Sequence, residues 1–291
     1  MQCVLITGAN KGIGLAIVTK ILSETDNYRV YLGARDQSRG DTAMKQFLSA
    51  NPDFDRTRLK VLLIDPGNDE SVNAAAEKLK EEKITLSGIV NNAGGFLPFP
   101  EMLNLHLYGP KRVCDAFLPI LDKERGMIVN VSSGGAAACV AKSTHKFKTA
   151  LRRTDLSWEE IDGIANEILC VFKNGVAEDD EKIMQKITGV AWSLNGYGFT
   201  KALLNCYSCS LQKKYPYLRI CAVNPGFIET DLSRPYLKGR APEEIGMRPV
   251  SDGASNPCKV LFGEEIQPHK YLDSDGAWRN LDEVNPNDFG G

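Results

Sequence analysis

The fold of this chain is decided by the stretch Val4-Leu5-Ile6-Thr7-Gly8-Ala9-Asn10-Lys11-Gly12-Ile13-Gly14 near its start. The apolar opening predicts a short buried strand, and apolar residues at helical spacing over 12–24 predict a helix that begins inside the Gly-rich turn. Glycine permits this tight turn and lets the backbone approach a phosphate, which the free N–H groups of a helix N-terminus attract. Such a stretch is often only a turn, but its place at the first strand of an α/β sheet favours a dinucleotide site. The expected contacts are Gly8, Asn10, Lys11, Gly12, Ile13 and Gly14.

Short apolar runs alternate with helical patterns along the rest of the chain, and we expect strands at 30–32, 61–64, 89–90, 127–131, 220–223 and 271–272. Strands that are apolar on both faces indicate a parallel sheet covered on both sides. Right-handed crossovers make this a Rossmann-like, doubly wound α/β fold. The alternation breaks over 134–196, so we expect a single domain over residues 1–291 with a helical insertion there. One helix of the insertion is expected to open with a capping box of Ser157 and Glu160.

Composition excludes several other classes of protein. Of 291 residues, 43% are hydrophobic and 25% charged, and the net charge is -2, which offers no polycationic surface for nucleic acid. No apolar stretch approaches the roughly 20 residues of a membrane span, and the N-terminus lacks the pattern of a signal peptide. Eight cysteines without dense spacing suit reduced thiols. We therefore expect a cytoplasmic protein with no nucleic-acid partner, no membrane partner and no metal site, in which Cys206 and Cys209 are structural thiols.

The end of the second expected strand bears on the choice of dinucleotide. Sheets that bind NAD commonly place an acid there to hold the ribose 2′-hydroxyl, whereas this chain has Arg35. Lys11 adds a second positive charge in the Gly-rich turn. Two cations suit a 2′-phosphate, so the sequence favours NADP. Asp36 is expected either to pair with Arg35 or to begin the next turn.

Three further motifs follow in order. The first, Asn91-Asn92-Ala93-Gly94, follows a strand at the carboxyl edge of the sheet, where ligands bind in such folds. The second joins Tyr197 and Lys201, four positions apart on one helix face, where a cation lowers the pKa of a phenol that exchanges protons near neutral pH. The third, Ser132-Ser133, ends the strand at 127–131 and offers a hydroxyl to a substrate oxygen.

Taken in this order, the motifs closely resemble the short-chain dehydrogenase/reductase family, and within it the carbonyl reductases and the salutaridine-type alkaloid reductases of plants. The resemblance implies that Tyr197 is the proton donor, that Lys201 binds the ribose and lowers the pKa of the Tyr, and that Ser133 binds the substrate oxygen. It also implies that Asp65 contacts the adenine and that Asn91 supports the cofactor. The further cofactor contacts that it implies are Ala93, Gly94, Tyr197, Lys201, Pro225, Gly226, Ile228 and Thr230.

Two departures from the family pattern stand out. Where the family has a catalytic Asn three positions before a Gly, this chain has His106 before Gly109. Either His106 still anchors a proton-relay water, through its carbonyl or its ring, or it is a packed helix residue and the relay is altered. The stretch from Gly94 to His106 is also short for the family, and its apolar residues either line a pocket or pack; these are Phe96, Leu97, Phe99 and Met102.

These features predict an NADPH-dependent reductase of aldehydes or ketones. The apolar pocket candidates Phe96, Trp192, Phe227 and Tyr236 suggest a bulky or aromatic carbonyl compound. In carbonyl reductases a long insertion before the catalytic Tyr covers the face that other members use to dimerise, so the resemblance implies a monomer. Two alternatives stay open: an NADP-dependent dehydrogenase of a specific secondary alcohol, and a non-catalytic NADPH-binding regulator.

Overall fold

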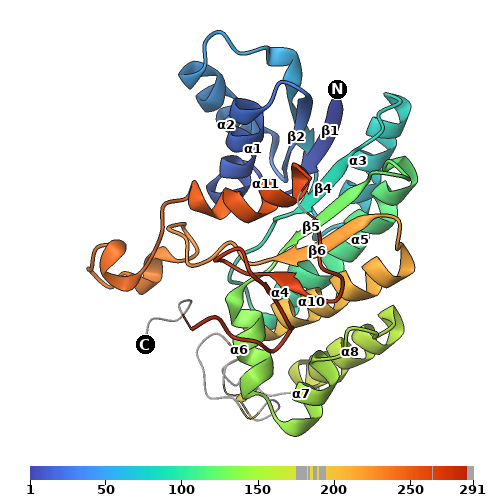
Figure 1. Ribbon diagram of the computed structural model, residues 1–291, viewed down its shortest axis with the longest axis vertical. Helices are drawn as coiled ribbons and strands as arrows, with labels where there is room; N and C mark the ends of the chain where they lie inside the picture. The colour runs from blue at the N-terminus through green and yellow to red at the C-terminus, as the bar shows by residue number, and fades with distance from the viewer. Residues whose placement is uncertain (175–181, 183, 186–188, 190–194, 264, 287–291) are drawn as a thin grey trace.

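The computed structural model describes residues 1–174, 182, 184–185, 189, 195–263 and 265–286. The described residues form an eight-stranded sheet in the order β3-β2-β1-β4-β5-β6-β7-β8 (Figure 1). All neighbouring strands are parallel except β7 and β8, which form an antiparallel pair. The strands are β1 Gln2–Ile6, β2 Tyr28–Ala34, β3 Leu59–Leu63, β4 Gly88–Asn91, β5 Met127–Val131, β6 Arg219–Val223, β7 Tyr271–Leu272 and β8 Trp278–Arg279.

Helices cover both faces of this sheet, as the sequence predicts. On β1 the side chains of Val4 and Ile6 enter one buried cluster with α1, α2 and α11, while Cys3 and Leu5 enter a second cluster with α3, α5, α6, α8 and α10. The doubly wound fold is therefore confirmed. The helices are α1 Gly12–Glu24, α2 Gln37–Ala50, α3 Asp69–Glu81, α4 Phe99–Leu103, α5 Gly109–Phe117, α6 Gly134–Lys142, α7 His145–Leu151, α8 Trp158–Asn174, α10 Asn195–Lys214 and α11 Ser255–Leu261.

The stretch after β5 begins with a core helix, since α6 is buried from Gly134 to Val140 against α10. The later helix α8 opens with the expected capping box: the Ser157 N–H donates to Glu160 Oε2 at 2.8 Å, and the Glu160 N–H donates to Ser157 Oγ at 3.2 Å. In the view of Figure 1, α7 and α8 lie below the sheet, beside α6 and α10. Aromatic contacts fix α8 there, because the Trp158 ring lies 5.9 Å from Tyr108 and 5.6 Å from Tyr207.

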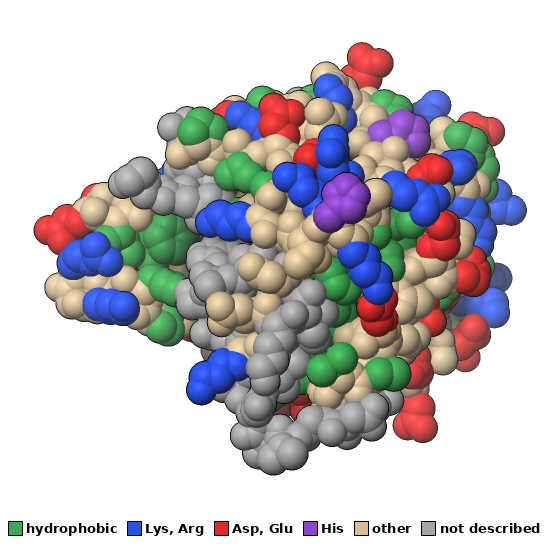
Figure 2. All heavy atoms as spheres, turned by 90° about the horizontal axis from the view of Figure 1, so that it is seen from below, with side chains coloured by type: hydrophobic (Ala, Val, Ile, Leu, Met, Phe, Trp, Pro, Cys, Tyr) green, Lys and Arg blue, Asp and Glu red, His purple; other side chains and the backbone are tan. Residues whose placement is uncertain are grey.

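Charged side chains of both signs are interspersed on the face of the molecule that Figure 2 shows. On the described residues of the face shown in Figure 2, lysines and arginines lie among aspartates and glutamates, in keeping with a net charge of -2. Within the described part of the chain, no helix combines the length and the apolar character that a membrane crossing requires.

The close packing of α6 on α10 generates a prediction. A Cβ added at Gly198 would lie 2.5 Å from the Gly135 carbonyl oxygen and 2.9 Å from Cys139 Cβ. We expect Gly198→Ala to lower the free energy of unfolding by about 2 kcal/mol, because the helices must separate. Urea denaturation measures this. In the control Gly163→Ala, within α8, an added Cβ meets nothing within 4 Å, and we expect a gain of up to about 1 kcal/mol. Equal effects of the two substitutions would contradict the close contact.

Candidate active site

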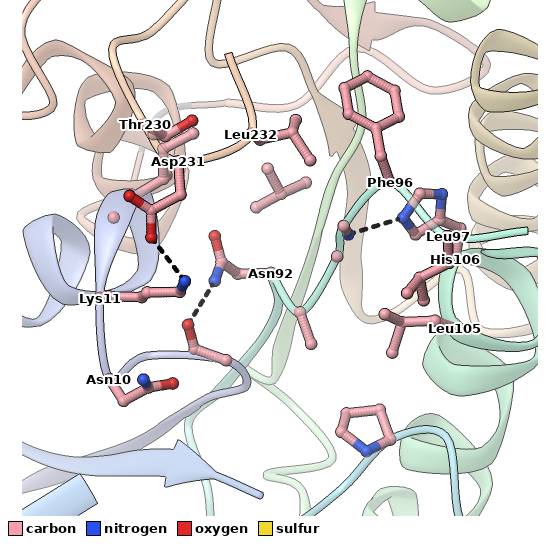
Figure 3. A pocket seen from close by; sticks show the side chains of 18 of the residues that line it. Asn10, Lys11, Asn92, Phe96, Leu97, Leu105, His106, Thr230, Asp231 and Leu232 are labelled. Atoms are coloured by element: carbon pink, nitrogen blue, oxygen red, sulfur yellow. Dashed lines mark hydrogen bonds and ion pairs between the residues drawn. The ribbon is translucent and has the colours of Figure 1, made fainter. Parts of the chain in front are cut away.

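The expected site residues converge on one cavity of about 740 Å³ at the carboxyl edge of the sheet (Figure 3). Its wall combines the Gly-rich turn, the ends of β2, β3 and β5, the loop after β4, the start of α10 and the loop after β6. The expected residues that line it are Gly8, Asn10, Lys11, Gly12, Ile13, Arg35, Asp65, Ala93, Gly94, Phe96, His106, Tyr197, Lys201, Pro225 and Thr230. Gly14, Asn91, Ser133, Gly226, Phe227, Ile228 and Tyr236 are not among the described residues that line it.

The Gly-rich turn is held by close backbone contacts. Gly8 and Gly12 have φ values of 62° and 55°, in the left-handed region that favours glycine. A Cβ at Gly14 would lie 2.5 Å from Asn92 Nδ2, and that amide donates to the carbonyl oxygens of Thr7 at 2.9 Å and Gly8 at 3.2 Å. Lys11, which precedes α1, makes no side-chain cap, so the first N–H groups of α1 are available to an anion.

Of the neighbouring asparagines, Asn92 therefore orders the turn, while Asn91 faces into the protein. Asn91 Nδ2 donates to Asn130 Oδ1 on β5 at 2.8 Å and is buried beneath the cavity. The sequence identifies both residues but assigns the cofactor contact to the first. Side chains alternate along a strand, so of these two consecutive residues at the end of β4 only Asn92 points toward the turn.

One end of the cavity is basic. Arg35 and Arg39 line it, and Lys11 lies across it with its Nζ 2.6 Å from Asp231 Oδ2. Asp36, which also lines this end, begins the next helix, because its Oδ1 caps α2 by accepting the Arg39 N–H at 2.8 Å. Arg39 is a cation that the sequence interpretation missed, and its place in the first turn after the capping Asp36 is the signal that could have found it.

Tyr197, Ser133 and Lys201 meet at the other end. Ser133 caps α6, accepting the Gly135 N–H at 3.1 Å, and hydrogen-bonds the Tyr197 phenol. Burial raises the pKa of Tyr197 to about 12, although the hydrogen bond from Ser133 opposes this rise. Lys201 Nζ donates to the Val131 carbonyl oxygen at 2.8 Å and lies 5.8 Å from the Tyr197 ring.

The pKa of Tyr197 thus moves in the opposite direction from the one expected from its neighbour. Lys201 is 5% exposed, and burial lowers the pKa of its ammonium to about 7. A lysine that is only partly ionised at neutral pH stabilises a phenolate weakly. Desolvation of the phenol therefore dominates, an effect that residue spacing does not reveal.

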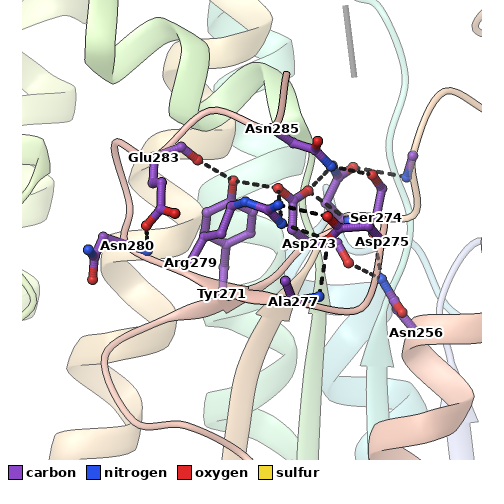
Figure 4. A network of polar contacts seen from close by, with 12 residues as sticks. Asn256, Tyr271, Asp273, Ser274, Asp275, Ala277, Arg279, Asn280, Glu283 and Asn285 are labelled. Atoms are coloured by element: carbon purple, nitrogen blue, oxygen red, sulfur yellow. Dashed lines mark hydrogen bonds and ion pairs between the residues drawn. The ribbon is translucent and has the colours of Figure 1, made fainter. Parts of the chain in front are cut away.

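The segment after β6 is held by a buried polar network (Figure 4). Asn224 Nδ2 donates to Asp273 Oδ1 at 2.6 Å, and Asn256 Nδ2 donates to the carbonyl oxygens of Asn224 at 3.0 Å and Asp273 at 2.6 Å. Arg279, on β8, lies with its Nη1 3.0 Å from Asp273 Oδ2. Asp273 is fully buried, so its carboxylate fixes the start of the Asn224–Gly226 segment against β7. The sequence interpretation missed this residue.

The aromatic substrate candidates form a chain of contacts. The Phe96 ring lies 4.9 Å from Tyr197 and 6.3 Å from Tyr236, and Tyr236 lies 6.4 Å from Phe227. Phe96 and Leu97 line the cavity, whereas Phe99 and Met102 are buried in the core and pack. Trp192, the remaining candidate, lies outside the described residues.

Comparisons with known proteins identify the family of this chain. The sequence model of the short chain dehydrogenases matches residues 2–145. The chain is 30% identical to (+)-neomenthol dehydrogenase of Arabidopsis thaliana over 93% of each chain. It is also 30% identical to carbonyl reductase [NADPH] 1 of Rattus norvegicus, over 91% of this chain and 96% of that one. The fold is similar to that of salutaridine reductase from Papaver somniferum, with a TM-score of 0.75 at 21% identity, covering 92% of this chain and 98% of that chain.

This chain belongs to the short-chain dehydrogenase/reductase family. It is thus an oxidoreductase of a family that uses nicotinamide cofactors.

The buried ammonium of Lys201 generates a pH prediction. Its pKa is about 7 in the folded protein against 10.5 ordinarily, so between these values the unfolded chain binds more protons and stability rises with pH. We expect the stability of the wild type relative to Lys201→Met to increase by about 2 kcal/mol from pH 7 to pH 9. Urea denaturation of both proteins at each pH measures this, with the exposed Lys213→Met on the same helix as control. A relative stability that falls with pH would contradict the lowered pKa.

Proposed function

We propose that this protein reduces an aldehyde or ketone with NADPH. One observation carries the proposal: a single cavity has Tyr197 and Lys201 at one end, with Ser133 bonded to the Tyr, and Lys11, Arg35 and Arg39 at the other. Reduction adds a hydride to the carbonyl carbon and a proton to its oxygen, giving an alcohol. The reduced nicotinamide supplies the hydride when it is bound.

The protein fits NADPH at several points. The uncapped start of α1 and the close-packed turn at Gly8 and Gly14 suit the pyrophosphate, because a backbone without side chains comes near it. Arg35, Arg39 and Lys11 suit the 2′-phosphate. We assign Asp65 to the adenine. We assign Pro225, Gly226, Ile228 and Thr230 to the nicotinamide, and Ala93 and Gly94 to the cofactor. Asn91 faces into the protein and would support the cofactor site indirectly, through Asn130. The carbonyl reductase relatives, named for their use of NADPH, and a carbonyl reductase from chicken fatty liver with NADPH bound support the same cofactor.

The protein side of the mechanism follows from the pKa of Tyr197. Because that pKa is raised to about 12, the phenol is protonated at neutral pH, which is the form that a proton donor requires. Ser133 hydrogen-bonds the phenol, and in this proposal its hydroxyl binds the substrate oxygen. Lys201, held on the Val131 carbonyl, binds the ribose in this proposal.

The opposite direction, oxidation of a specific secondary alcohol with NADP, is the second candidate. The name of one relative, (+)-neomenthol dehydrogenase, favours this direction. It uses the same residues, but Tyr197 would have to act as a phenolate base, which its raised pKa disfavours.

We further propose a cytoplasmic monomer. All eight cysteines are free thiols, as suits a reducing compartment. The monomer rests on α8, which covers α10 through the contact of Trp158 with Tyr207. It also covers the turn before α5, because the Tyr108 hydroxyl donates to Asp162 Oδ1 at 2.7 Å. A dimer at micromolar concentration in equilibrium sedimentation would contradict the monomer.

The first experiment tests the proton donor. NADPH oxidation is followed at neutral pH against quinones, aromatic aldehydes and bulky ketones for the wild type and Tyr197→Phe. We expect turnover by the wild type and a loss of about 10³-fold in kcat for the variant, because the ring is kept and only the proton is lost. NADPH affinity, measured by fluorescence titration, should change little. Tight NADPH binding without turnover in either direction would refute the reductase and favour a regulatory role.

The second experiment tests the cofactor. We expect Arg35→Ala and Arg39→Ala each to raise the KM for NADPH by about tenfold or more, because each removes a charged partner of the 2′-phosphate. The KM for NADH should stay within about twofold. The exposed Arg56→Ala, outside the cavity lining, is the matched control. Equal use of NADH and NADPH by the wild type would contradict the assignment.

A further inference from the structure

His106 is buried in the wall of the cavity and has no role in the proposed proton transfer. It lies in a π-helical turn, Asn104–Tyr108, where the Gly109 N–H donates to the Asn104 carbonyl five residues earlier. Such turns rotate one side chain out of the regular helical register. Here the imidazole, 1% exposed, points between the loop after β4 and the first turn of α10 (Figure 3).

Both ring nitrogens of His106 have protein partners. The Gly95 N–H donates to Nε2 at 3.2 Å, and Nδ1 lies 2.9 Å from Thr200 Oγ1. The Thr200 hydroxyl in turn donates to the Tyr197 carbonyl oxygen at 2.8 Å. One protonation pattern satisfies all three bonds: a neutral imidazole with its hydrogen on Nδ1, donating to Thr200. An imidazolium would direct a proton from Nε2 at the Gly95 N–H.

The charges around the ring favour the same form. The ionisable groups that face it are Tyr197 and Lys201, both on α10. Burial and the positive charge of Lys201 hold the pKa of His106 well below its ordinary range. No described carboxylate contacts the ring to compensate a positive charge.

The contacts of His106 join two parts of the site. The ring meets Tyr197 edge-on at 5.4 Å, while Phe96, the residue after Gly95, lies against the same Tyr ring at 4.9 Å. Gly94 is packed so tightly that an added Cβ would lie 3.3 Å from His106 Nε2. The imidazole therefore sets the distance between α10 and the loop after β4. It thereby also sets the position of Phe96 against Tyr197.

We propose that His106 is a neutral positioning residue that holds Phe96 against Tyr197 and thereby shapes the wall on which a bulky carbonyl substrate packs, while its ring transfers no proton in the reaction. The role in substrate binding rests on the reductase function proposed above. The tautomer assigned to His106 does not rest on that function, because it follows from contacts within the protein. In this proposal His106 is a packing residue and not a relay through its ring.

The tautomer is tested on the wild-type protein. The chain has three histidines, and only His106 is buried, so ¹⁵N-histidine NMR from pH 5 to pH 8 follows it against two exposed rings. We expect His106 to show a protonated Nδ1 and an unprotonated Nε2 throughout. Titration of His106 within this range, or a hydrogen on Nε2, would overturn the proposal whether or not the protein is a reductase.

The positioning role is tested by kinetics with a double-mutant cycle. We expect His106→Asn to raise the KM for a bulky aromatic ketone about tenfold and to change kcat by less than about threefold. In Phe96→Ala the same change at His106 should have little further effect, since the two residues act through one contact. His145→Asn is the control. Additive effects, or a loss confined to kcat together with a shifted pH profile, would overturn the proposal. If His106→Asn does not fold, Thr200→Val replaces it, because it removes the hydrogen bond between His106 Nδ1 and Thr200 Oγ1.

Discussion

The reversal of strand order between β1 and β4 is the constraint on which the rest of this structure depends. The chain leaves these neighbouring parallel strands in opposite directions, so a crevice opens between the Gly-rich turn after β1 and the loop after β4. The two segments still meet, because the Asn92 amide bonds the Thr7 and Gly8 carbonyls where Gly14 leaves room for it. The segments that line the proposed site end at this crevice.

The crevice is built largely from side chains that bind backbone rather than from apolar packing. Asn92 holds the turn, Ser133 caps α6, and Asn256 holds the segment after β6 through the Asn224 carbonyl oxygen. His106 is a further case, since it bonds the Gly95 N–H. Buried polar groups that are fully paired fix one arrangement of the chain. The fold thus supplies the crevice, and these bonds give it a defined shape.

Much of this could be predicted from the sequence, because periodicity and chain order carry the fold. The alternation of strands and helices, the capping box at Ser157 and the meeting of Tyr197 with Lys201 follow from local spacing. The remaining features depend on contacts between residues that are far apart in the sequence, or on burial. The two-residue strand β8 is too short to leave a pattern, and Asp273 acts on Asn224 from another strand. The direction of the Tyr197 pKa shift depends on burial, which no motif records.

The ion pair of Lys11 and Asp231 has a consequence for affinity. These side chains meet across the basic end of the cavity, and both are more than half exposed. An anion that binds between them takes over an ammonium already paired with a carboxylate, so Lys11 exchanges one partner for another. Asp231 keeps its second ion pair, with Arg234 at 3.0 Å. The exchange is cheap, because exposed pairs contribute at most about 1 kcal/mol and weaken as salt is added. The number of cations at this end therefore overstates the attraction that an arriving phosphate gains.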